Sequence, residues 1–84
     1  MLVGAMLMLE GSTVRAGGNA WRSRSIGQDV DGHHRWLQVA LVGRPFYVVL
    51  LKMSLTAREA DAVRALEWWL AHPGHEDGDV IEVD

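Results

Sequence analysis

Histidines and aspartates gather near the carboxyl end of the sequence, at His72, His75, Asp77 and Asp79. Imidazole and carboxylate groups are both zinc ligands, and a short loop that contains glycine could bring the four side chains together. Their spacing matches no strong metal signature, and the simpler interpretation is a solvated loop in which His72 interacts with the negative end of a preceding helix. We keep a metal-dependent enzyme at this loop as the third of three functional hypotheses.

A second pair of histidines, His33 and His34, follows the turn residues Asp31-Gly32. Neighbouring residues of a strand point to opposite faces, so the two imidazoles cannot bind one metal ion from a single face. A histidine could instead pair with Asp29 or Asp31 across the hairpin. The alternative is that both histidines are ordinary surface residues beside a turn.

No other pattern indicates catalysis. The sequence has no nucleophile elbow, phosphate-binding loop or paired-carboxylate motif. It has no cysteine, which excludes a disulfide framework, a thiolate metal site and a cysteine nucleophile. We therefore expect a protein that is not an enzyme and that needs no cofactor.

Arginines and tryptophans occur together in the middle of the chain, and Arg22, Arg24, Arg35 and Trp36 could form a nucleic-acid surface. Such a sheet face would stack bases on its aromatic rings and hold phosphates with its cations. Strand alternation opposes this hypothesis, because Arg35 and Trp36 face opposite ways. The alternative is that the arginines protect an edge strand from aggregation. Nucleic-acid binding is our second hypothesis.

Trp68 is the most informative single residue. On a helix it lies roughly opposite the centre of the apolar face, near Asp61, Ala65 and His72, while Trp69 points to the core. Tryptophan is enriched at binding hot spots, so these four residues are candidates for a partner-binding surface. The alternative is that residues 11–20 or the last strand fold over Trp68.

Length and composition limit the class of protein. The 84 residues form one domain, residues 1–84. A chain this short has a thin stability margin, which disulfides, a metal or a partner subunit often improve. With 49% apolar residues and four tryptophans, the chain has more apolar surface than one small core is expected to hide. A homodimer is therefore expected.

Charge and hydropathy limit the surroundings of the protein. A net charge of −3 argues against a strongly basic nucleic-acid footprint. No apolar run approaches the roughly 20 residues that a membrane helix needs, so no membrane partner is expected. The apolar run Leu2–Leu9 lacks the basic start of a signal peptide, which favours a cytoplasmic protein.

The first half of the chain is expected to form strands. Leu2–Leu9 fits a buried strand, although a short helix is the alternative, and residues 11–20 are predicted as a loop. Trp21–Val30 is a weakly patterned strand, placed at an edge, with Gly27 as a bulge. Asp31-Gly32 predicts a type I′ turn, which leads into a strong strand at His34–Val42.

The second half is expected to hold a central strand, one helix and a last strand. Gly43-Arg44-Pro45 predicts a turn, and Phe46–Met53 is a strand that is apolar on both faces, as in a strand covered on both sides. Thr56 and Glu59 resemble a capping box at the start of a helix that runs to Ala71 and stops before Pro73. The apolar face of this helix holds Ala62, Val63, Leu66, Trp69 and Leu70.

A short alternating strand over residues 80–84 completes the predicted fold. The fold class is α+β: an antiparallel β-sheet in the order β-β-β-β-α-β, its first strand uncertain, with one amphipathic helix packed on one face. The leading functional hypothesis is a small non-enzymatic module that binds and regulates another protein and forms a homodimer. The composition, with a single lysine, suggests a GC-rich genome, and a phage or mobile element could use such a module to inhibit a host protein.

Overall fold

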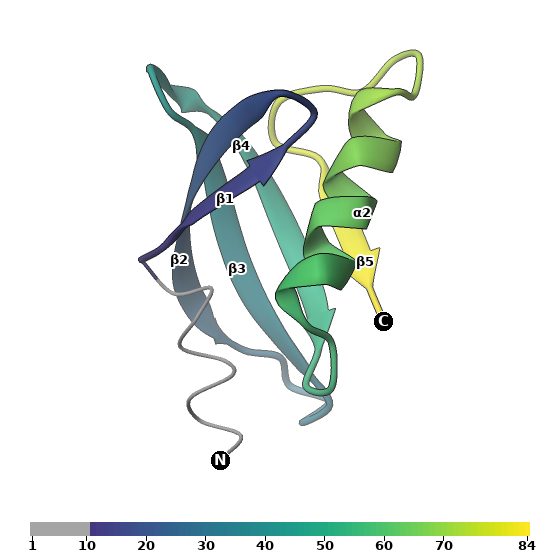
Figure 1. Ribbon diagram of the computed structural model, residues 1–84. Coiled ribbons are helices and arrows are strands. Elements are labelled where there is room, and N and C mark those ends of the chain that lie inside the picture. Colours follow the sequence, from purple (N-terminus) through teal and green to yellow (C-terminus); the bar gives the residue numbers. More distant parts are fainter. Residues whose placement is uncertain (1–10) are drawn as a thin grey trace.

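The computed structural model describes residues 11–84, which form five strands and one helix around a single core (Figure 1). The predicted strand at Leu2–Leu9 lies outside the described residues. The elements are β1 (Thr13–Ala16), β2 (Asn19–Gln28), β3 (His34–Leu41), β4 (Arg44–Ser54), α2 (Glu59–Leu70) and β5 (Val80–Val83).

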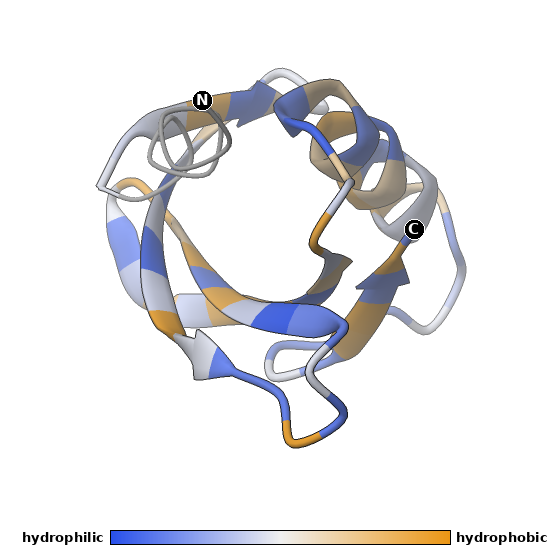
Figure 2. Ribbon diagram, turned by 90° about the horizontal axis from the view of Figure 1, so that it is seen from below, coloured by the Kyte–Doolittle hydropathy of each residue, from blue (hydrophilic) through white to orange (hydrophobic). Residues whose placement is uncertain are grey.

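The strands lie in the sheet in chain order, β1-β2-β3-β4-β5. The first three pairings are antiparallel, and β5 runs parallel to β4 because α2 carries the chain back along the sheet. The helix contacts both edge strands, β1 and β5. Seen along the strands, the curled sheet and the helix form a ring (Figure 2), so the helix closes the opening between the two edges.

The core lies inside this ring. Strand alternation sends every second side chain inward, and the inward residues of β3 and β4 are almost wholly buried. One face of α2 covers them. The largest side chains that are fully buried are Trp21, Leu37, Leu51, Met53 and Leu66.

The predicted fold class is confirmed, with one helix packed on a mostly antiparallel sheet in the order β-β-β-β-α-β. The bulge predicted at Gly27 is also present, where the pairing of β2 with β3 shifts register between Ser25 and Gly27. The prediction that β2 lies at an edge is wrong. The stretch predicted as a loop contains β1, which takes the edge position beside it.

The tight type I′ turn lies at Gly17-Gly18 and not at Asp31-Gly32. Ala16 pairs directly with Asn19, and both intervening glycines have positive φ, at 61° and 77°. Asp31 does not have positive φ, so its turn is of another type. The Asp31 carboxylate instead accepts hydrogen bonds from the backbone N–H groups of the two residues that follow Gly32.

The helix begins two residues later than predicted. Its N-cap is Arg58, and the Asp61 carboxylate accepts a hydrogen bond of 2.9 Å from the Arg58 backbone N–H. Thr56 is not the cap, because its hydroxyl lies 3.0 Å from the Ser54 hydroxyl and is used in the preceding turn. The residue between them, Ala57, is buried against the core.

The outward face of β4 is not covered by residues 11–84, although a strand covered on both sides was predicted. Val49 and Leu51 are buried inside the ring. On the outside, Val48 and Leu50 are only half-buried, and Phe46 is 89% exposed. The helix covers one face of the curled sheet, and the other face is open.

Candidate protein-binding surface

Trp68 projects from the outer side of α2 and is 60% exposed. Its ring contacts the imidazole of His72 in a tilted arrangement, with ring centroids 4.1 Å apart and ring planes 41° from parallel. We call Asp61, Ala65, Trp68 and His72 the Trp68 surface, since helical spacing aligns the first three residues and the ring contact adds the fourth. Asp61 and Ala65 are half-buried beside the exposed rings.

The neighbouring residue, Trp69, fixes the direction in which Trp68 points. Trp69 is buried, and its indole N–H donates a 2.8 Å hydrogen bond to Asp79. Its ring also packs against Trp21 and Tyr47 in the core. Because successive helical residues are about 100° apart, an anchored Trp69 leaves Trp68 facing outward. The described residues therefore do not fold over Trp68.

Asp61 is held in place at the start of the helix. One carboxylate oxygen caps the Arg58 backbone N–H, and the other forms an ion pair with Arg64, one turn further along. The Arg64 side chain is 72% exposed. The Trp68 surface is thus a pair of aromatic rings in contact, preceded on the helix by an ion pair between Asp61 and the exposed Arg64 guanidinium.

The predicted metal ligands His72, His75, Asp77 and Asp79 form local hydrogen bonds instead of facing one point. Asp79 accepts from the Glu76 backbone N–H and the Trp69 indole, and these donors lower the pKa of its carboxyl group. Asp77 accepts from the Val48 backbone N–H at 2.7 Å. The His75 ring lies 2.8 Å from the His72 carbonyl oxygen. Metal binding at this loop stays a prediction.

Within residues 11–84, one cluster does place three metal-ligand atoms within 4.8 Å of one another: Asp29, Asp31 and His34. The expected histidine–aspartate pair is found here, with 2.6 Å between His34 Nδ1 and Asp31 Oδ2. Asp29 Oδ1 accepts a 3.0 Å hydrogen bond from the Trp36 indole N–H, and Asp29 Oδ2 lies 3.8 Å from Lys52 Nζ. The cluster therefore has internal partners for its charges.

Acid should weaken the fold through Asp31. Backbone hydrogen bonding to His33 is the largest cause that lowers its pKa, from 3.8 to about 2. A pKa lowered by folding contributes stability above the unfolded value, and this contribution is lost as the pH falls from about 4 to about 2. We expect Asp31→Asn to make the free energy of unfolding less dependent on pH across this range.

Urea denaturation at a series of pH values measures this effect. Asparagine keeps an oxygen that accepts the two backbone N–H groups, so the variant removes the charge with little change of shape. Asp79→Asn tests the second aspartate with a lowered pKa. Parallel pH profiles for the Asp31 variant and the original chain would contradict the assignment.

The outer face of the sheet brings together three of the four predicted nucleic-acid residues. Arg22 pairs in register with Ala40, and Arg24 with Gln38, so both arginines share the outward face with Trp36. Arg24 Nε donates a 2.7 Å hydrogen bond to Gln38. The Trp36 indole is half-buried and bonded to Asp29.

Arg35 is not part of this face, because its register partner on β4 is the buried Met53. A hollow of about 380 Å³ lies over β2 and β3 beside the two arginines. Its lining residues are Gly11, Arg22, Ser23, Arg24, Gln38, Ala40 and Pro45. Nucleic-acid binding at this face stays a prediction.

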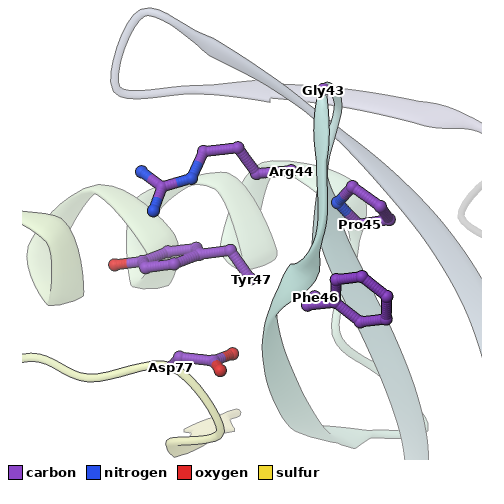
Figure 3. A pocket seen from close by; sticks show the side chains of 6 residues that line it. All are labelled: Gly43, Arg44, Pro45, Phe46, Tyr47 and Asp77. Carbon is purple, nitrogen blue, oxygen red and sulfur yellow. The ribbon is translucent and has the colours of Figure 1, made fainter.

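A larger hollow, of about 520 Å³, was not predicted (Figure 3). The Arg44 guanidinium lies 5.3 Å from the centre of the Tyr47 ring, and Asp77 lies on the other side of that ring. The hollow forms because β4 leaves regular pairing between Arg44 and Val48. The sequence signal was Pro45, which interrupts a ladder of hydrogen bonds, followed directly by two aromatic residues.

A comparison of the chain with models of protein families found no match, and comparisons with curated proteins and with solved structures found none either. In the part of the chain from residue 11 onward, no helix has the length and apolar character needed to cross a membrane.

Proposed function

We propose that this protein is a non-enzymatic module that binds another protein chain through the Trp68 surface. The observation that carries the proposal is Trp68 itself, a large apolar side chain that is 60% exposed on a helix whose other face is buried. Tryptophan is the residue type most enriched at sites that dominate binding energy.

The contacts around Trp68 support this role. Its ring lies against the His72 ring and projects from a helix that is anchored through Trp69, so little side-chain freedom remains to be lost on binding. A polar pair, Asp61 and Arg64, lies one to two helical turns before Trp68 on the same side of α2. An apolar anchor inside a polar rim is the arrangement found at protein interfaces. A chain this small could act by covering a functional surface of its partner, as an inhibitor does.

Affinity capture with tagged variants tests the proposal. We expect the original chain to retain at least one protein from extracts of the native source. The Trp68→Ala variant should retain at least about tenfold less of that protein. Phe46→Ala is the matched control, because it also removes an exposed aromatic ring, 89% exposed, from a distant strand. Circular dichroism verifies that both variants fold.

An identical set of retained proteins for the original chain and both variants would overturn the proposal. Loss of a protein with the Phe46 variant alone would also overturn it, since binding would then depend on the outer face of β4.

A further inference from the structure

The residues of the Trp68 surface have a symmetric order in the sequence. Asp61 and His72 are equally many residues from a midpoint between Leu66 and Glu67, and so are Ala65 and Trp68, with His72 just past the end of α2 at Leu70. In chain order the side chains are therefore a carboxylate, a small apolar group, a large aromatic ring and an imidazole. In an antiparallel copy the same four side chains follow in the opposite order. A second copy laid antiparallel would place unlike groups opposite each other at every position.

The pairs that result are complementary in size. Near the two-fold axis, Trp68 of each copy faces Ala65 of the other copy. The exposed indole thus meets a residue that has only a methyl group. A small side chain opposite a large one allows two helices to approach closely.

The pairs are also complementary in charge and hydrogen bonding. Asp61 of one copy faces His72 of the other, so a fixed carboxylate meets an imidazole at both ends of the contact. Arg64 lies on one side of the Trp68 surface, and in antiparallel helices equivalent sides meet. Its exposed guanidinium group would then reach the indole face of Trp68 of the second copy, a favourable cation–π geometry.

We propose that the partner bound by the Trp68 surface is a second copy of this chain, joined by antiparallel packing of the two α2 helices about a two-fold axis. This inference rests on the proposed function and names its partner. It also accounts for the exposed tryptophan without a further segment of the same chain.

A mass measurement in solution is the first test. The helix has 12 residues, and small interfaces are weak, so sedimentation should be followed up to about 1 mM protein. We expect a dimer whose dissociation constant rises at least about 30-fold with Trp68→Ala. Phe46→Ala should leave the dissociation constant unchanged.

Cysteine cross-linking tests the register directly, because the natural chain contains no cysteine. Asp61→Cys and His72→Cys are mixed and oxidised, and the disulfide-linked dimers are identified by intact mass. The antiparallel register puts position 61 of one copy beside position 72 of the other, whereas the two copies of position 61 lie about 16 Å apart along the helix axis. Equal amounts of the two variants would give as much mixed dimer as both same-position dimers together if pairing were random, and we expect the mixed dimer to outnumber them at least about threefold.

The outcomes separate this inference from the proposed function. A monomer at every concentration overturns the inference, while capture of a different protein that depends on Trp68 would still uphold the function. A dimer that survives Trp68→Ala, or cross-links in statistical proportions, places the contact elsewhere and overturns the inference. If the protein forms no dimer and captures no protein through Trp68, the inference and the proposed function are both overturned.

Discussion

Replacing Trp21 by alanine is expected to destabilise the fold by about 3–5 kcal/mol, the cost typical of removing a large aromatic side chain from a core. Trp21 is wholly buried, and its ring contacts both Tyr47 and Trp69, with centroids 6.1 Å and 6.3 Å away. Its indole N–H donates to the Ala16 carbonyl oxygen, which lies in the neighbouring strand.

The loss is large compared with the whole stability of the protein. A chain of this length has a free energy of unfolding of roughly 4–13 kcal/mol, at 0.05–0.15 kcal/mol per residue. Thermal denaturation followed by circular dichroism should show a Tm lower by at least about 12 °C, or no folded baseline.

Two further variants make the Trp21 prediction specific. Trp21→Phe keeps a ring against Tyr47 and Trp69 but loses the hydrogen bond to Ala16, so an intermediate Tm is expected. Trp68→Ala, measured in dilute protein, removes the same side chain from an exposed position and should change the Tm little. A Trp21→Ala variant as stable as the original chain would mean that this residue is not part of the core.

The importance of Trp21 could be predicted only in part from the sequence. Strand alternation puts Trp21 and Ser23 on the same face of β2, and both are buried. The edge position assigned to this strand was wrong, because β1 is only four residues long and begins in a stretch rich in glycine and serine. Local composition indicated a loop there, whereas pairing with a neighbouring strand made it a strand.

The helix could be predicted well, and the outward direction of Trp68 with it. A period of 3.6 residues repeated over several turns gives a strong signal, so the inward Leu66 and Trp69 and the outward Trp68 were all correctly assigned. The start of the helix was not, because Thr56 and Asp61 are both plausible capping residues. The turn from Ser54 to Ala57, which only the folded chain shows, decided between them.

The grouping of side chains from different strands could not be predicted. The positions of Arg22, Arg24 and Trp36 on one face depend on the register between β2 and β3, which the bulge near Gly27 changes. The hollow beside Tyr47 likewise depends on irregular pairing of β4 and on Asp77, which is distant in the sequence. Alternation within one strand carries no information about either.

Gly17→Ala is expected to destabilise the fold more than Gly18→Ala, although both glycines lie in the same two-residue turn. Both have positive φ, so an alanine at either position costs about 1–2 kcal/mol. A Cβ atom at Gly17 would lie 2.5 Å from Cδ1 of Leu70, whereas nothing lies within 4 Å of a Cβ atom at Gly18.

The difference between the two variants therefore measures the contact of the β1–β2 turn with the end of the helix. Leu70 is half-buried against the core, so displacing it should add about 1–3 kcal/mol, as overpacking does. The Gly17 backbone N–H also donates to Glu67, and a shifted turn would lengthen that 3.2 Å hydrogen bond. Urea denaturation of both variants gives the two free energies. Equal values would mean that Leu70 moves aside without cost, and that the turn does not hold the last helical turn, where Trp68 stands.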